Sequence, residues 1–452
     1  MDYISVVSIV IFATTLFLMI KRPRGIKLGY AAGIGAVASL VLGTVTLGQA
    51  AQAFANIWDA SLAFIGIVAF AVILDAMGFF KWAALKVVRL ANGSGIRLYF
   101  YISILTTVVS ILFANDSAVL ILTPIVLEII NRLKFDGKSK LAYLFSAGLI
   151  ADTAAMPLIT SNPINILSAD YFGYTFIDHF IFMGPIALAT ITTSILIVYM
   201  FFRKKIPKKY DISLIDNVDT DSTPIGTGML KISLATLVAI DVGYVTASLY
   251  RIPVSLVICS GAIFLLIVYC MNLKIYGADS KRKGLKGLAS EINWDIVLFM
   301  LSIFLVVQGL TNAGIADLLA SLLVETNSMP SIFGIISPSL IVTFGASLMN
   351  NWPMTILGLM SIQQITNTIV LSNQMFTGLV FSNIIGNNLG PHFFPLGSLA
   401  ILMWLEIMKR KGVNISLKSY LKVGAVLSIV EVVVASVVLW VEINYFSFSL
   451  II

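Results

Sequence analysis

Apolar stretches long enough to cross a lipid bilayer recur from one end of this chain to the other. Of its 452 residues, 59% are apolar and only 11% are charged, whereas soluble domains carry about a quarter charged residues. A transmembrane helix needs about 20 apolar residues, so the chain has room for roughly 10 to 12 crossings. The sequence therefore predicts an all-α polytopic membrane protein, which excludes an ordinary soluble enzyme.

Short polar segments separate the candidate spans. The spans cover residues 4–20, 28–47, 59–79, 98–130, 141–175, 180–202, 231–249, 254–273, 293–311, 331–370, 377–408 and 423–444. The net charge of +7 comes from cations between the spans, which the positive-inside rule explains better than nucleic-acid binding. We therefore expect the lipid bilayer, and no nucleic acid, as the surroundings of this chain.

The positions of Lys and Arg predict two re-entrant hairpins. All cations except Arg251 fall on the cytoplasmic side if 98–130 and 331–370 each enter the bilayer, turn inside it and leave on the side of entry. Polar residues that favour turns and helix caps interrupt both stretches, at 114–117 and at 350–353. In this topology both termini are external and the protein is a multi-pass protein of the plasma membrane.

Each half of the chain also contains a long helix with a polar break. We expect the helix at about 141–175 to break at 161–165, and the helix at about 377–408 to break at 386–392. The predicted fold is an inverted repeat of five transmembrane helices plus one re-entrant hairpin per half, comprising 1–202, a cytoplasmic linker at 203–230, and 231–452. Such repeats, with discontinuous helices at mid-membrane, are typical of secondary transporters that bind substrate near the midplane.

Several motifs in these segments are similar to those of one transporter family. They include Phe113–Asp116, Leu120–Val126, Ala151–Ala154, Ser161–Asn162, Met349–Asn351, Leu389–Pro391 and Gly397–Ala400. From about residue 20 to 430, in order, the chain resembles ArsB-type arsenite/antimonite efflux pumps of the ion transporter superfamily. The chain departs from the usual family pattern at Asn388, where an acidic residue is typical, at His392, where Lys is typical, and at Ala76, where Glu is usual.

This resemblance implies a transporter that exports arsenite or antimonite, and neither an enzyme nor a cofactor-dependent protein. Both substrates are neutral trihydroxides near pH 7, so their site needs neutral hydrogen-bond donors and acceptors, which Asn supplies together. The candidate substrate-binding residues are Asn115, Ser117, Ser161, Asn162, Asn165, Asn350, Asn351, Thr355, Asn387 and Asn388. The same side chains also suit capping of the hairpin turns, and one residue can do both.

Capture of arsenic by thiolates is disfavoured, because Cys259 and Cys270 lie in one span, about 16 Å apart along a helix. No metal site is expected. The chain has no Walker-type phosphate loop, so it is not expected to hydrolyse ATP itself, and a separate cytoplasmic ATPase subunit is left open.

Protons moving inward are the expected driving force. Carboxyl groups inside the membrane are the usual proton carriers, and Asp116 and Asp152 are placed near mid-depth. Histidine side chains can titrate in the physiological range, so His392 is the third candidate, although a structural hydrogen bond suits it equally. Asp116 also suits a fixed anion at a helix N-terminus. Glu431 lies in an outer span, where pairing and coupling are equally favoured.

The main alternative is a sodium- or proton-coupled ion or organic-anion carrier of the same superfamily with a different substrate. An anion site would show cations at the breaks, where the sequence offers only His392, whereas a sodium site suits the same Asn and Asp groups. A passive channel is disfavoured by hairpins entering from opposite sides. An intramembrane hydrolase is disfavoured too, since His179 is placed in an external loop and His392 lacks a second ligand at helical spacing.

Overall fold

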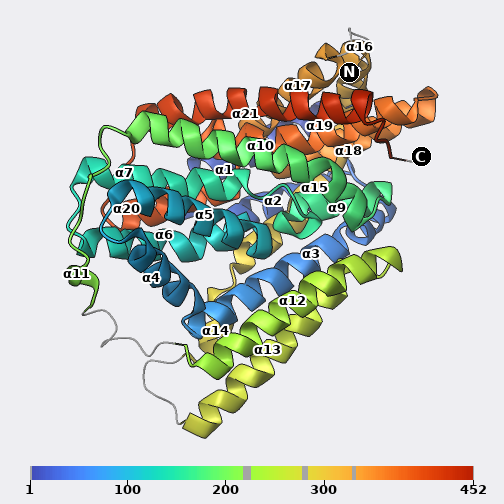
Figure 1. Ribbon diagram of the computed structural model, residues 1–452. Helices are drawn as coiled ribbons and strands as arrows, with labels where there is room; N and C mark the ends of the chain where they lie inside the picture. Colours follow the sequence, from blue (N-terminus) through green and yellow to red (C-terminus); the bar gives the residue numbers. More distant parts are fainter. Residues whose placement is uncertain (1–2, 217–224, 277–282, 328–331, 451–452) are drawn as a thin grey trace.

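The computed structural model describes residues 3–216, 225–276, 283–327 and 332–450, and helices make up its regular structure (Figure 1). The α-helices are α1 (Tyr3–Lys21), α2 (Leu28–Val41), α3 (Leu47–Ala76), α4 (Phe79–Ala91), α5 (Gly95–Phe113), α6 (Asn115–Arg132), α7 (Gly137–Phe145), α8 (Ala151–Thr153), α9 (Pro163–Phe172), α10 (Phe176–Phe202), α11 (Ser213–Asp216), α12 (Thr227–Leu249), α13 (Val254–Tyr276), α14 (Leu285–Glu291), α15 (Trp294–Asn312), α16 (Ile315–Asn327), α17 (Phe333–Met349), α18 (Asn351–Thr368), α19 (Asn373–Leu389), α20 (Leu399–Arg410) and α21 (Leu417–Tyr445). Among the described residues, 8 helices are long and apolar enough to cross a membrane. The predicted all-α membrane class is confirmed.

Helix α3 and two amphipathic helices differ from the prediction. Helix α3 begins at Leu47, well before the predicted start at 59, because a capping box formed by Thr46 and Gln49 opens it inside a polar stretch. Helices α4 and α16 were not predicted, since both are shorter than a span and each lies beside an apolar run. Gly78 and Gly314, with φ of 84° and 82°, make the turns that lead into them.

Each predicted hairpin turns at a single residue. Helices α5 and α6 pack against each other and meet at Ala114, which has φ 62° and ψ 154°. Helices α17 and α18 do the same at Asn350, with φ 82° and ψ 151°. A non-glycine residue at positive φ is uncommon, and the two residues have nearly the same dihedral angles. The two hairpins therefore turn with the same backbone geometry.

The broken helices are interrupted at slightly different places than predicted. The first break runs from 154 to 162, because Pro163 fits the first turn of α9 and Asn162 caps it; the predicted break at 161–165 extended too far. The second break runs from 390 to 398, since α19 remains helical through Leu389. Pro391, which has no backbone N–H, follows directly. Two short turns, η4 (Gly390–His392) and η5 (Pro395–Gly397), lie within this break.

Matching features of the two halves keep one constant spacing. The pairs Asp59 and Asp295, Gly78 and Gly314, Ala114 and Asn350, Asp152 and Asn388, and Asn162 and Ser398 are each 236 positions apart. This register runs through helix, turn, hairpin tip and break without an insertion, which supports the predicted duplication.

The packing of the halves is reciprocal. Helix α13 packs on α3, and α2 packs on α15. Asp59 of α3 accepts hydrogen bonds from Val254 N and Ser255 N at the start of α13, at 3.2 and 3.0 Å. Asp295 of α15 accepts one from Gly29 N near the start of α2, at 3.0 Å. The inverted orientation of the halves and the boundaries 1–202 and 231–452 stay predictions, and residues 217–224 of the predicted linker 203–230 lie outside the described residues.

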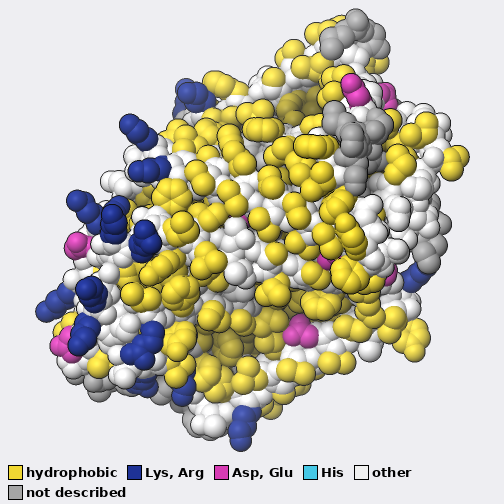
Figure 2. Space-filling model, turned by 45° about the horizontal axis from the view of Figure 1, so that its top comes forward, with side chains coloured by type: hydrophobic (Ala, Val, Ile, Leu, Met, Phe, Trp, Pro, Cys, Tyr) yellow, Lys and Arg dark blue, Asp and Glu magenta, His cyan; other side chains and the backbone are white. Residues whose placement is uncertain are grey.

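Charge is distributed unevenly between the two ends of the molecule. On the face in Figure 2, Lys and Arg side chains gather at one end, where Figure 1 places α7, α11 and α20. Both chain termini lie toward the opposite end (Figure 1). The cations and the termini thus lie toward opposite ends, as the predicted topology requires; that the cationic end is cytoplasmic and both termini are external stays a prediction.

Candidate functional site

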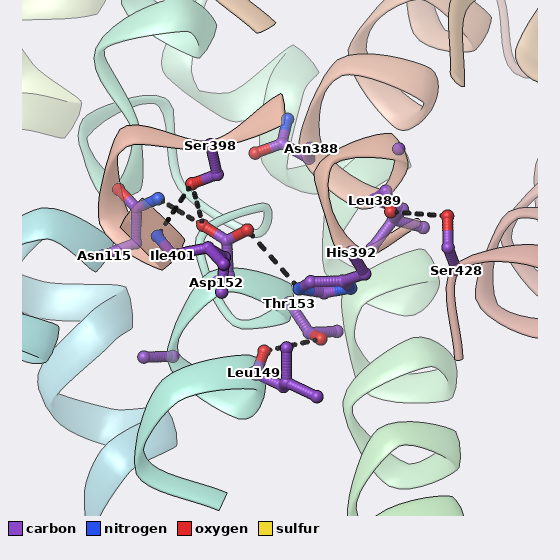
Figure 3. Close-up of polar contacts among 12 residues, drawn as sticks. Asn115, Leu149, Asp152, Thr153, Asn388, Leu389, His392, Ser398, Ile401 and Ser428 are labelled. Atoms are coloured by element: carbon purple, nitrogen blue, oxygen red, sulfur yellow. Dashed lines mark hydrogen bonds and ion pairs between the residues drawn. The ribbon is translucent and has the colours of Figure 1, made fainter. Parts of the chain in front are cut away.

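Asp152 lies at the centre of a buried polar cluster that joins both halves of the chain (Figure 3). Its Oδ1 accepts a hydrogen bond from Asn115 Nδ2 at 2.7 Å and another from Ser398 Oγ at 3.0 Å. Asn115 is the first residue of α6 after the hairpin turn, and Ser398 caps α20 after the second break. The Asp152 carboxylate therefore connects a hairpin tip with both broken helices.

His392 connects Asp152 to a second buried carboxylate. Its Nε2 lies 3.4 Å from Asp152 Oδ2, and its Nδ1 lies 2.8 Å from Glu431 Oε2. Thr153 Oγ1 donates to the other oxygen, Glu431 Oε1, at 2.8 Å. Both ring nitrogens of His392 thus face carboxylate oxygens, as those of an imidazolium would. Nδ1 forms a hydrogen bond with Glu431, whereas Nε2 and Asp152 Oδ2 lie within ion-pair distance but form no hydrogen bond. The result is a chain of three ionisable groups, Asp152–His392–Glu431.

A cluster of asparagine side chains holds the two breaks together. Asn162 Nδ2 donates to Asn388 Oδ1 at 3.0 Å, and Asn388 Nδ2 donates to Asn165 Oδ1 at 3.0 Å. Asn162 Oδ1 also accepts from Ile164 N, and Asn165 Nδ2 donates to Ala155 O. These amides use their hydrogen-bonding capacity within the protein.

Two equivalent contacts across the breaks differ in charge. Ser398 donates to Asp152 at one break, and Asn162 donates to Asn388 at the other. Donor and acceptor are each related by the 236-residue spacing. One acceptor is therefore a carboxylate paired with His392 and its counterpart is a neutral amide, so the ionisable chemistry of the site is confined to one of the two positions.

The candidate substrate-binding residues fall into two groups. Ser161, Asn162, Asn165, Asn350 and Asn388 use their side chains in protein contacts; Ser161 donates to Ile111 O at 2.8 Å and Asn350 to Leu396 O at 3.0 Å. The other group keeps buried oxygens without a hydrogen-bond partner among the described residues, namely Asn115 Oδ1, Ser117 Oγ, Asn351 Oδ1, Thr355 Oγ1 and Asn387 Oδ1. Unpaired buried polar atoms are costly, so this second group is available for a ligand.

Asp116 stands apart from the chain of ionisable groups. It is 6% exposed in the first turn of α6 and makes no hydrogen bond or ion pair within the part of the chain that the structure describes. The position before α6 is Ala114, which offers no capping side chain. Its carboxyl group interacts electrostatically with that of Asp152, and its neighbours in the chain are Asn115 and Ser117.

Sequence reasoning missed two members of the site and misplaced one histidine. Ser398 was not a candidate, although its 236-residue spacing from Asn162 marks it. Glu431 was left undecided, because only the folded chain brings α21 against η4. His179 does not lie in a loop: it is fully buried in α10, with Nε2 2.9 Å from Met156 O.

Comparison with known proteins identifies the family. The sequence model described as "Arsenical pump membrane protein" matches residues 7–443. The chain is 37% identical over 425 residues to the arsenical pump membrane protein of Escherichia coli, covering 93% of this chain and 94% of that protein. It is 36% identical over 425 residues to the protein of the same name from Yersinia enterocolitica, with the same coverage.

A more distant relative and a solved structure extend the likeness. A putative arsenical pump membrane protein of Bacillus subtilis is 27% identical over 426 residues, covering 91% of this chain and 93% of that protein. The YdaH transporter of Alcanivorax borkumensis, described as having an unusual topology, superposes with a TM-score of 0.55 at 13% identity and 88% coverage of both chains. That structure supports the transporter fold alone. By its sequence, this chain belongs to the ArsB family of arsenical pump membrane proteins.

Proposed function

We propose that this protein exports arsenite and antimonite from the cytoplasm as neutral trihydroxides, in exchange for protons entering across the plasma membrane. The observation that carries the proposal is the position of Asn115. Its Nδ2 donates to Asp152, while Oδ1 of the same amide is buried and free. One side chain thus touches both the proposed proton carrier and the proposed substrate site.

The free groups suit a neutral hydroxylated substrate. The unpaired atoms at Asn115, Asn351 and Asn387 are amide oxygens, which accept hydrogen bonds from substrate hydroxyls. Ser117 and Thr355 carry free hydroxyls that can also donate to a substrate oxygen. No Lys or Arg occurs at the hairpin tips or breaks, so the site has little to attract an anion. This distinguishes a trihydroxide from an organic anion as substrate.

The chain Asp152–His392–Glu431 is the proposed proton carrier. When Asp152 is ionised, it holds Asn115 Nδ2 and leaves the amide oxygen directed to the substrate. A proton arriving at Asp152 weakens both that hydrogen bond and the attraction to His392, because a neutral carboxyl is a poorer acceptor than a carboxylate. Substrate and proton then favour different arrangements of the same residues, as exchange requires.

Arsenite uptake into inside-out membrane vesicles tests the proposal. We expect uptake when the vesicle interior is acidified and its loss when an ionophore collapses the gradient. Asp152→Asn and Glu431→Gln should each abolish gradient-driven uptake. Glu442→Gln is the matched control, since Glu442 is also buried on α21 but makes no hydrogen bond through its carboxylate oxygens within the described residues.

The outcomes separate the parts of the proposal. Uptake that survives Asp152→Asn would remove this residue from coupling. Uptake that follows a sodium gradient and ignores a proton gradient would favour sodium coupling, which the same oxygen ligands suit. Absence of arsenite and antimonite uptake under both gradients would refute the proposal that these two compounds are the substrates.

A further inference from the structure

An ion pair connects the turn after the first helix to the second broken helix. Arg22 Nη1 lies 3.7 Å from Glu406 Oε2, and both side chains are partly exposed. Arg22 belongs to the turn between α1 and α2, whereas Glu406 lies on α20, at the cationic end of the molecule. Arg410, one helical turn further along α20, also binds Glu406, at 2.6 Å.

The corresponding place at the other end of the molecule is an open cavity. It has a volume of about 580 Å³ and lies between α3, α9, α12 and α18. Arg251, in the turn between α12 and α13, and Asp170, on α9, both line it. No ion pair forms between these two side chains, both of which are described and exposed. Helices α9 and α20 lie at opposite ends of the molecule (Figure 1).

The acidic residues of these two places are equivalent in the register of the halves. Asp170 and Glu406 are 236 positions apart, the same spacing as the hairpin tips and the breaks. Arg22 and Arg251 lie 229 positions apart, outside that register, but each lies in the turn after the first helix of its half and has positive φ, 44° and 54°. Each of these turns leads into a helix whose N-terminal amides are held by an equivalent aspartate, Asp295 or Asp59.

We propose that Arg22–Glu406 and Arg251–Asp170 are a pair of alternating gates, of which the first is closed and the second open in this structure. This inference rests on the proposed transport function. When the carrier turns over, Arg251 moves onto Asp170 and closes the cavity, while Arg22 separates from Glu406. The four side chains are positioning residues that set which side of the membrane the substrate site faces.

The charges at the open gate favour its closure. The carboxyl group of Asp170 lies within hydrogen-bond range of the Asp59 carboxyl, so two acidic groups share one wall of the cavity. Two carboxyl groups this close hold a proton between them, and a guanidinium that approaches favours release of that proton to the open cavity and pairs with the carboxylate that results. Arg251 is the one Lys or Arg among the described residues that line this cavity, and its side chain is exposed.

Labelling of a single cysteine in the cavity tests the gates without any substrate. The parent carries Cys259→Ser, Cys270→Ser and Ala55→Cys, since Ala55 is exposed on the cavity wall. A membrane-impermeant maleimide is added to intact cells and the initial labelling rate is measured. An exposed ion pair shifts a two-state equilibrium constant by about two- to fivefold, so Arg22→Gln should slow labelling by up to that factor.

Two variants control for effects on folding and on charge alone. Arg410→Gln removes the partner of Glu406 that lies on the same helix, so it should leave the labelling rate unchanged. The exchange Arg22→Glu with Glu406→Arg should restore the parent rate. Labelling unchanged by Arg22→Gln, or slowed equally by Arg410→Gln, would overturn the proposal.

Cross-linking tests the open gate directly. With Arg251→Cys and Asp170→Cys in the cysteine-free background, oxidation should join the two positions, and adding Arg22→Gln should raise the yield by a similar factor. The purified variant should elute normally in size-exclusion chromatography, which shows that it is folded. Absence of a cross-link in both backgrounds would then refute closure of the Arg251–Asp170 gate. Because neither assay uses arsenite, the gates can fail while arsenite uptake holds, or the reverse.

Discussion

Replacing His392 by Leu should destabilise the protein strongly, because it leaves two buried carboxylates without a cation. Among the described residues, no other basic side chain contacts Asp152 or Glu431. At an effective dielectric constant of 20, the 2.8 Å contact to Glu431 is worth about 6 kcal/mol and the 3.4 Å contact to Asp152 about 5 kcal/mol of attraction. Desolvation offsets much of this, so we expect a net loss of about 3–5 kcal/mol.

The loss of unfolding free energy in His392→Leu is expected to come from uncompensated charge. A further variant separates this cause from lost packing. Adding Asp152→Asn and Glu431→Gln to His392→Leu removes both charges with little change of shape, so most of the stability should return. Unfolding of the purified protein by SDS in mixed micelles, followed by tryptophan fluorescence, measures the free energies.

Two results would refute this reasoning. One is a loss of unfolding free energy below about 1 kcal/mol for His392→Leu, which would mean that the two carboxylates need no cation. The other is a triple variant no more stable than the single one, which would assign the effect to packing around His392. Glu442→Gln provides the background for removing a buried carboxyl that has no such partner.

Three further variants have defined outcomes. A Cβ at Gly148 would lie 2.6–2.8 Å from three ring atoms of the buried Trp404, so Gly148→Ala should cost about 1–3 kcal/mol in the same assay; an unchanged value would show that the ring moves aside freely. Ser in place of both Cys259 and Cys270 should leave arsenite uptake intact, and an inactive double variant would point to thiolate binding. Hydrogen bonds from the Ser139 side chain and backbone hold the pKa of Asp136 below its usual range. The ionised Asp136 carboxylate therefore stabilises the folded protein at neutral pH, and this contribution is lost as the pH falls through the folded-state pKa of Asp136. The thermal-stability difference between wild type and Asp136→Ala should accordingly narrow in acid; a constant difference would refute the charge contribution.

Hydropathy and local backbone preferences determine most of the helical framework. Apolar runs of spanning length specify the long helices, and the polar residues at 114–117 and 350–353 mark the hairpin tips, because both signals depend on neighbouring residues. The breaks were found for the same reason, although their ends shifted by a few residues where Pro163 opened a helix. Helices α4 and α16 were missed, since an amphipathic helix has no apolar run to reveal it.

The working parts of the candidate site depend on contacts that no local pattern contains. Asp152, His392 and Glu431 come from α8, η4 and α21, and only the packing of the two breaks against α21 brings them into one chain. The sequence predicted ten polar substrate-binding residues at the tips and breaks, without indicating which of them are free to bind a substrate. Which amides are used within the protein and which keep a free oxygen is decided by long-range hydrogen bonds, such as Asn162 to Asn388, and these exist only in the tertiary structure.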